Sequence, residues 1–291
     1  MPEMTIGLFK GRAVGASIPI ARGLLVLCAI ATAACTIDLG SKGPEQTDPA
    51  AFAWNQPVDA GKTIKIRNLN GSVEVRPATD GNVKVTASVK WHKGDPKKDL
   101  IFATSTFADG PMICAIWGTG SCNNDGYNSK TKWGSSKTDA EVAFIVWAPT
   151  GVRIDAFTAN GSVSVTATAP VRAQTINGEI KVATSVGPVD AETVNGSVDI
   201  RMTTLGPDGP VRAHTVNGSA TAYLPEKFDG RVALSATLGE VTSDFASADL
   251  QKSSKSLTET LGTGGRLVDL GTITGSAALH KLNAKGEVVA P

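Results

Sequence analysis

Thr193-Val194-Asn195-Gly196-Ser197-Val198-Asp199-Ile200 is the stretch that decides the fold, because close copies of it recur along the chain. Asn-Gly stands inside similar segments at Asn70, Asn160, Asn177, Asn195 and Asn217. The last four of these Asn residues, at positions 160, 177, 195 and 217, are 17, 18 and 22 residues apart. A regular period of about 20 residues is typical of stacked repeat architectures. The repeat therefore predicts an architecture, whereas catalytic motifs rarely repeat.

The composition indicates many strands and few helices. Glycine is abundant, with 31 residues, and Val, Ala and Thr occur in short alternating runs. The formal net charge is +1 and the chain has no long basic block, so nucleic acid is not an expected partner. Repeat proteins grow by adding coils, so we expect one domain over residues 51–291 rather than two ordinary ones.

The N-terminus has the pattern of an export signal over residues 1–34. Basic residues precede the apolar run 23–30, which is too short to span a bilayer permanently. Small residues then lead into Cys35. We expect the signal to be removed and the polar, Gly- and Pro-rich residues 35–50 to form a tether.

Ala33-Ala34-Cys35 resembles the end of a bacterial lipobox, in which the Cys becomes lipid-modified and is the first mature residue. Thr32 stands where Leu is usual, so ordinary cleavage after Ala33 stays open as the alternative. We expect a lipid at Cys35 to anchor the protein to a membrane, in the bacterial cell envelope and facing the periplasm or the surface of an outer membrane.

Cys114 and Cys122 are the two cysteines left after export and lipidation. An exported protein meets an oxidising compartment, so this pair is predicted to form a disulfide closing a short loop. A metal site is not predicted, because the chain has no Cys-x-x-Cys motif and its three His residues are scattered. No cofactor is expected.

The least regular part of the sequence is an insertion at about residues 106–139, rich in Gly, Ser, Asn and Lys. It contains both cysteines, together with Trp117, Tyr127 and Trp133, which are predicted to be exposed aromatics and are candidates for binding. The alternative is a disulfide-linked hairpin whose Trp residues only pack on the flank of the repeats.

Aligning the copies on Asn tests whether they stack in parallel. The residues six, four and two positions before each Asn form columns of one strand face, which places Asn on the same inward side. Stacked Asn side chains can bond from coil to coil as a ladder. The columns are Ile154, Val171, Val189 and Val211; Ala156, Ala173, Ala191 and Ala213; and Thr158, Thr175, Thr193 and Thr215.

Five positions before each Asn the charges alternate in sign: Asp155, Arg172, Asp190, Arg212. Opposite charges on neighbouring strands attract, so in-register stacking would place each charge between opposite partners. The competing fold is a meander of β-hairpins, because Asn-Gly is also a strong hairpin signal. We predict an all-β, single-stack parallel β-solenoid with short Asn-Gly corners. Later copies degrade at Leu238 and Thr274, as in terminal repeats.

The repeated Thr-Val-Asn-Gly-Ser-Val pattern behind an export signal resembles the bacterial putative-adhesin domain family, a domain of unknown function expected to form a β-solenoid. The resemblance covers residues 64–275, interrupted at 100–140. It implies adhesion and brings no catalytic residues.

The sequence contains few candidate catalytic residues. The column three positions before Asn contains Glu192 and His214, a carboxylate near an imidazole, which is a candidate general-base pair. Motifs for nucleotide binding or nucleophilic catalysis are absent from the sequence. We therefore predict a non-enzymatic envelope module that binds a glycan or another envelope protein, with its oligomeric state undetermined. The alternatives are a carbohydrate-active enzyme and a structural or sensory protein that binds a membrane protein.

Overall fold

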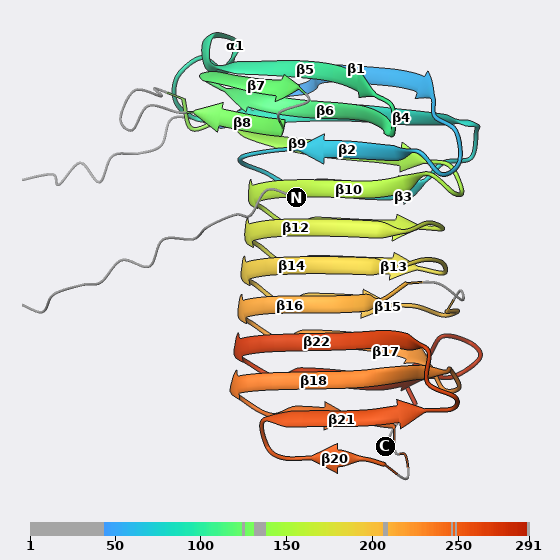
Figure 1. Cartoon of the computed structure of the whole chain (residues 1–291). Helices are drawn as coiled ribbons and strands as arrows, with labels where there is room; N and C mark the ends of the chain where they lie inside the picture. The colour runs from blue at the N-terminus through green and yellow to red at the C-terminus, as the bar shows by residue number, and fades with distance from the viewer. Residues whose placement is uncertain are drawn as a thin grey trace, which may run out of the picture. The chain divides into compact units, whose positions relative to one another are not determined.

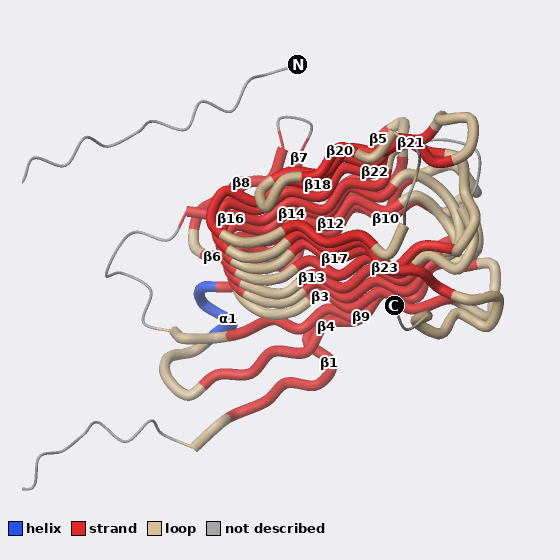
Figure 2. The backbone as a smooth tube through the Cα atoms, turned by 90° about the horizontal axis from the view of Figure 1, so that it is seen from below, coloured by secondary structure: helices blue, strands red, loops and turns tan. Residues whose placement is uncertain are grey.

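The computed structural model describes residues 44–123, 126–130, 138–205, 209–245, 247 and 249–289. Its fold is all-β, as the sequence predicts, and two large open sheets face each other across the core (Figure 2). Within the described residues the helix α1 (Pro96–Asp99) is a single turn, and no helix has the length and apolarity needed to cross a membrane. The predicted signal 1–34 and Cys35 lie outside the described residues.

Sheet A has ten strands. In spatial order they are β1 (Gln46–Pro57), β4 (Asn82–Trp91), β9 (Glu141–Ala148), β3 (Val73–Pro77), β11 (Val163–Ala167), β13 (Ile180–Thr184), β15 (Val198–Arg201), β17 (Ala220–Pro225), β23 (Ala277–Leu282) and β19 (Val241–Ser243). From β9 to β19 neighbouring strands pair in parallel, whereas β1, β4 and β9 pair antiparallel.

Sheet B has eleven strands. In spatial order they are β20 (Gln251–Lys252), β21 (Ser256–Leu261), β18 (Gly230–Leu238), β22 (Arg266–Thr274), β16 (Val211–Asn217), β14 (Val189–Asn195), β12 (Val171–Asn177), β10 (Arg153–Asn160), β2 (Thr63–Arg67), β6 (Gly110–Trp117) and β5 (Leu100–Phe107). A separate hairpin pairs β7 (Thr119–Asn123) with β8 (Gly126–Lys130). Figure 1 shows the central strands of sheet B stacked one above another.

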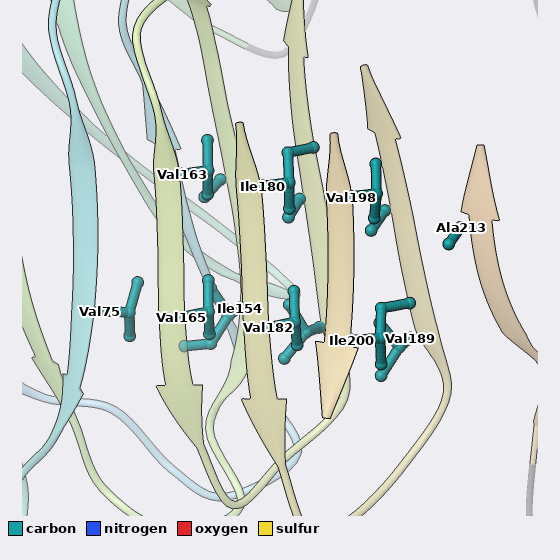
Figure 3. Close-up of a cluster of buried hydrophobic side chains, with 14 of the residues drawn as sticks. Val75, Ile154, Val163, Val165, Ile180, Val182, Val189, Val198, Ile200 and Ala213 are labelled. Atoms are coloured by element: carbon teal, nitrogen blue, oxygen red, sulfur yellow. The ribbon is translucent and has the colours of Figure 1, made fainter. Parts of the chain in front are cut away.

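The repeat copies stack as parallel coils rather than as hairpins. β12 pairs with β10 on one side and β14 on the other, and equivalent residues such as Thr158 and Thr175 stand opposite each other. Each coil crosses from sheet B to sheet A at its Asn-Gly corner. The core between the sheets is built from the inward columns, where Val163, Ile180 and Val198 follow one another along sheet A (Figure 3). The meander alternative is thus wrong for these copies.

Each corner is closed by a buried Thr. The Thr175 hydroxyl donates to the carbonyl of Gly161 in the preceding coil at 2.9 Å, and Thr193 donates to Gly178 at 3.0 Å. The same bond recurs from Thr158 to Gly71, from Thr215 to Gly196 and from Thr272 to Gly218. A hydroxyl bonded in this way satisfies a polar group that would otherwise be costly to bury.

The Asn residues form the expected ladder, but on the outside of the corner. Asn177 donates to the Oδ1 atom of Asn160, Asn195 to Asn177 and Asn217 to Asn195, each at 2.8 Å. The prediction that Asn points inward is wrong, because these side chains are exposed. The Thr hydroxyl occupies the inner side of the corner, and the chain bends before Asn could enter it. Asn70 does not continue this side-chain ladder; it donates to the Ala140 carbonyl at 2.8 Å.

The glycine after each Asn is required by the close approach of neighbouring coils. A Cβ atom added to Gly196 would overlap the carbonyl oxygen of Gly178, and one added to Gly178 would overlap that of Gly161. The backbone of Gly196 also has a φ of 153°, a conformation that residues with a side chain rarely adopt. Close stacking of backbones, more than turn type, explains why Asn-Gly is repeated.

The spatial order of the last coils differs from their order in the sequence. β22 and β23 lie between the β16/β17 coil and the β18/β19 coil (Figure 1). The coil that comes last in the sequence is therefore inserted between two coils that precede it in the sequence. The coil at Leu238 is the last coil of the stack, and beyond β18 sheet B continues only with the antiparallel strands β21 and β20. Thr272 keeps the hydroxyl that closes the corner against Gly218, whereas Ala236 stands opposite Thr272 without one. The copy better suited to stack on Asn217 therefore takes the inner place, which the single-stack prediction did not foresee.

The predicted insertion at about 106–139 is only partly an insertion. Its β6 is a buried strand of sheet B that pairs in parallel with β2, and β5 pairs antiparallel with β6. At this end of the stack Phe102 of β5 packs against Phe52 of β1, with ring centroids 5.1 Å apart, and against Phe144 of β9 at 6.0 Å. Strands and aromatic rings thus cover the last coil at this end.

We expect Gly196→Ala to lower the free energy of unfolding by at least about 2 kcal/mol, because the added methyl overlaps the Gly178 carbonyl and the φ of Gly196 disfavours a side chain. Gly81→Ala is the matched control, since nothing lies within 4 Å of the position of its added Cβ. Denaturant midpoints of the two variants and the parent provide the measurement. Equal midpoints for Gly196→Ala and Gly81→Ala would contradict the stacking argument.

Candidate functional site

The outer face of sheet B presents side chains in three columns, with one residue from each strand in each column. Counted from Asn, the columns lie five, three and one positions earlier. In-register pairing of β10, β12, β14 and β16 places equivalent residues opposite each other, so one strand spacing, about 4.8 Å, separates neighbours in a column. A surface of this kind repeats the same chemistry at regular intervals.

The column five positions before Asn carries alternating charges in the predicted register. Arg172 stands opposite Asp155 and Asp190, and Arg212 stands opposite Asp190. The alternation extends beyond the repeats that predict it, to Lys65 on β2 and Asp269 on β22. Register alone therefore gives each of these charges an opposite neighbour.

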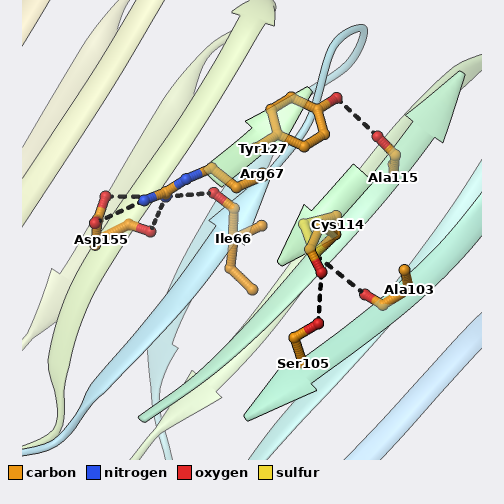
Figure 4. Close-up of a disulfide and its surroundings, with 9 residues drawn as sticks. Ile66, Arg67, Ala103, Ser105, Cys114, Ala115, Tyr127 and Asp155 are labelled. Carbon is orange, nitrogen blue, oxygen red and sulfur yellow. Dashed lines mark hydrogen bonds and ion pairs between the residues drawn. A yellow bond between two sulfur atoms is a disulfide. The ribbon is translucent and has the colours of Figure 1, made fainter. Parts of the chain in front are cut away.

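Only some of the charges in this column have a close ion-pair partner. Arg67 binds Asp155 through two hydrogen bonds of 2.7 and 2.9 Å (Figure 4), and the Nε2 atom of His214 lies 3.3 Å from Asp269. The Oδ1 atom of Asp190 is buried without a hydrogen-bond partner. Burial, with a smaller contribution from Glu192, raises the pKa of the Asp190 carboxyl, and the nearby arginines only partly offset this. Asp155 and Asp269 thus have close partners, whereas Asp190 is the acid of the column without one.

A hollow of about 380 Å³ lies at the start of these strands. Its wall contains one proline from each of three successive coils, and arginines from β10, β12 and β16 stand around it. The charged residues and prolines that line it are Arg153, Asp155, Pro170, Arg172, Pro188, Asp190, Pro210 and Arg212. Sequence reasoning missed this hollow, although the recurrence of Pro seven positions before Asn was visible in three copies.

The column three positions before Asn does not assemble the candidate general-base pair. Glu192 accepts a 2.8 Å hydrogen bond from the Gln174 amide, and His214 is turned to Asp269. Glu192 and His214 stand opposite each other on neighbouring strands, but no hydrogen bond or ion pair joins them. Glu192 is also exposed. The geometry supplies a polar stripe rather than a proton-transfer pair.

The column one position before Asn is apolar and exposed. Ile176, Val194, Val216 and Ile273 follow one another on β12, β14, β16 and β22, with exposed fractions between 36 and 48 %. The column runs beside the Asn ladder. A continuous row of exposed aliphatic side chains next to polar ones is a feature of surfaces that bind partners.

The β7–β8 hairpin lies against β6 and stands on the outer side of sheet B (Figures 1 and 4). Cys114 of β6 and Cys122 of β7 form a disulfide, with Cα atoms 6.2 Å apart. Tyr127 of β8 donates its hydroxyl to the Ala115 carbonyl at 2.8 Å, and its ring faces Phe157 of β10 at 6.3 Å. The hairpin is thus fixed to the sheet by covalent, polar and aromatic interactions.

The aromatic binding candidates are placed differently from the prediction. Trp117 is 3 % exposed and belongs to the core, so it is not the exposed ring that the sequence suggests. It ends β6, whose residues are all buried because the hairpin covers the outer face of that strand. Tyr127 is half-buried with its hydroxyl bonded, and Trp133 lies outside the described residues.

A metal site is not formed by the part of the chain that the structure describes, where no three His, Cys, Asp or Glu side chains converge in a way that could hold an ion. The charged groups of the outer face act as single charges, hydrogen-bond donors and acceptors.

We expect stability to fall more steeply above pH 10 in the parent protein than in Tyr127→Phe. Burial raises the pKa of Tyr127 to about 12, whereas an unfolded tyrosine titrates near pH 10. As pH rises past 10, the unfolded state releases this proton first, so the folded state loses relative stability between about pH 10 and pH 12. Denaturant midpoints from pH 9 to 11.5 measure the effect. Tyr223→Phe is the control, and a slope for Tyr127→Phe equal to that of the parent would contradict the assignment.

The solved structures similar to this chain include two bacterial proteins named as adhesion proteins. A putative cell adhesion protein from Clostridium sporogenes ATCC 15579 is 10 % identical with a TM-score of 0.45, covering 78 % of this chain and 98 % of its own. A putative adhesin from Bacteroides fragilis NCTC 9343 is 11 % identical with a TM-score of 0.34, covering 79 % and 98 %. No curated protein matches the chain. The family model described as Toastrack DUF4097 matches residues 149–279, the part that contains the Thr-x-Asn-Gly coils, and this part of the chain is therefore a Toastrack DUF4097 domain.

Proposed function

We propose that the chain is a non-enzymatic binding module of the bacterial cell envelope, which presents the outer face of sheet B to a polymer or to another envelope protein. The observation that carries the proposal is the set of three in-register columns on that face. Each column offers one chemistry repeatedly: charges, polar groups or aliphatic side chains. A ligand with repeating units can engage several strands at once, and such linked interactions raise overall affinity without any single strong site.

The distribution of side chains supports binding over turnover. Catalysis by general acid and base needs two groups within hydrogen-bond reach of one reacting centre. Glu192 is bonded to Gln174 and His214 lies against Asp269, so the two candidate groups are engaged separately. The apolar column beside them, including Val194 and Val216, adds area suited to packing against a partner rather than to chemistry.

Membrane attachment through a lipid on Cys35 belongs to the same proposal. β1 begins at Gln46, inside the predicted tether 35–50, so residues 36–45 would separate the anchor from this first strand. A short tether of this kind keeps a module near the membrane while leaving its sheet faces free. The anchor and the binding face are tested separately, because each can be wrong while the other holds.

A binding array of glycans and matrix or envelope proteins tests the function of the face. The full chain is expected to bind at least one class saturably, without forming product. Val194→Arg, which places a charge in the apolar column, should weaken that binding by about tenfold or more, because an unpaired charge replaces an aliphatic group at the interface. Thr166→Arg, at an exposed position on the outer face of sheet A, is the matched control.

Equal effects of Val194→Arg and Thr166→Arg would show that the outer face of sheet B is not the binding surface. Released product from any hit would identify an enzyme. In that case the rate of product formation is measured in Glu192→Gln combined with His214→Gln. Loss of product would assign catalysis to this pair, and an unchanged rate would place the catalytic site elsewhere.

We expect Cys35→Ala to move the protein from the membrane fraction to the soluble fraction of the cells that express it. Removing the thiol removes the site for the acyl chains, and no other anchor is expected. Cell fractionation with metabolic fatty-acid labelling measures both attachment and modification. Cys28→Ala, inside the predicted signal, is the control. Unlabelled parent protein would favour ordinary cleavage after Ala33.

A further inference from the structure

Three arginines around the hollow of sheet B have unused donors. Within the described residues, the side chains of Arg153, Arg172 and Arg212 form no hydrogen bond and no ion pair within 4.0 Å, although all three are exposed beside the hollow. A guanidinium has five N–H donors in a fixed plane, which suits carboxylates and other planar acceptors. Arg172 and Arg212 lie two strands apart, about 9.6 Å.

The acidic residues nearest to these arginines do not form ion pairs with them. Asp155 is held by Arg67 through two hydrogen bonds, and Asp269 is paired with His214. Asp190 stands between Arg172 and Arg212, yet no close ion pair joins it to either, and its Oδ1 atom has no hydrogen-bond partner. The hollow therefore combines a surplus of positive charge with one carboxylate that lacks a donor.

The prolines that line the hollow are suited to a ring with an apolar face. Pro170, Pro188 and Pro210 occur at equivalent positions of successive coils, and each lines the hollow. Proline has no N–H to satisfy, so its ring offers an apolar surface without an unpaired donor. All three prolines are partly exposed.

We propose that this hollow binds an acidic saccharide, the carboxylate of one sugar unit lying on Arg172 and Arg212 and a sugar hydroxyl donating to Asp190, with a ring face on the prolines. The proposal rests on the proposed binding function of sheet B and names the ligand class of that face. Arg153 supplies a further donor at the side of the hollow. An anion without hydroxyl groups satisfies the arginines and is repelled by Asp190, whereas a neutral saccharide satisfies Asp190 and leaves the arginines unused.

The probes are immobilised polygalacturonate, neutral galactan and inorganic polyphosphate, with the full chain in solution. We expect binding to polygalacturonate to exceed binding to the other two at the same ionic strength. Arg172→Gln combined with Arg212→Gln should weaken it by about a hundredfold, or about tenfold for each charge-assisted hydrogen bond that is removed. Arg231→Gln, on the outer face of β18 away from the hollow, is the charge-matched control and should change affinity by less than about twofold.

Asp190→Ala distinguishes the proposed site from a general effect of charge, which would change the affinity for both anionic polymers in the same direction. It should weaken polygalacturonate binding, because the acceptor for the sugar hydroxyl is removed, and strengthen polyphosphate binding, because a repelling charge is removed. Denaturant midpoints of all variants establish that each is folded; a variant that unfolds is replaced by the corresponding single change, Arg172→Gln or Arg212→Gln.

The outcomes separate this inference from the function on which it rests. Equal weakening by the double variant and by Arg231→Gln, or stronger binding of polyphosphate than of polygalacturonate by the parent, overturns the acidic-saccharide site. If polygalacturonate does not bind but another glycan or protein binds and its binding is abolished in Val194→Arg, the inference fails while the binding function stands. If neither set of variants weakens the binding of any ligand, both fail.

Discussion

The hydrogen bond from a buried Thr hydroxyl to the Gly carbonyl of the preceding coil is the interaction on which the rest of the structure depends. It occurs at five successive corners, from Thr158 to Thr272. The bond requires the two backbones to approach so closely that the residue after Asn must be Gly. It also turns the neighbouring Asn outward, where the amides bond from coil to coil. Thr, Asn and Gly in this motif therefore have three separate roles at one corner.

A fixed corner fixes the register of both sheets. Since a slip of one residue would exchange the inward and outward faces of a strand, the buried Val and Ala columns reinforce the same register. The outer columns follow as a consequence: charges face opposite charges from β10 to β16, and from β12 to β16 polar groups face polar groups and aliphatic groups face aliphatic groups. The surface pattern proposed for binding is thus produced by the packing of the core, and the two cannot change independently in the central coils.

The sequence predicts features that depend on neighbouring copies and misses those that depend on distant segments. The Asn ladder and the alternating charges are recoverable because identical residues at equivalent positions imply that the copies lie side by side. The burial of Trp117 cannot be predicted in this way, because β6 pairs with β2 across a long sequence interval and the β7–β8 hairpin covers β6. The inner place of the Thr274 coil follows from a hydroxyl at Thr272 and its absence at Ala236. The hollow depends on three prolines and on charge pairing by Arg67, which no single copy reveals.

The same rigid register explains why Asp190 stays unsatisfied between two arginines. Strand pairing sets the positions of the backbones, but a salt bridge also needs side-chain geometry that the backbone does not guarantee. Asp155 gains close partners because Arg67 lies two positions beyond Lys65 on β2, and Asp269 gains His214 from the neighbouring column. Beside Asp190 the equivalent position on β16 is His214, which is turned to Asp269 instead. The coils cannot shift to bring another cation closer without breaking the Thr-Gly corners. Donors and an acceptor are consequently left unused at one place on the outer face, and the proposed ligand, which carries both an acid and a hydroxyl, supplies the partners that they lack.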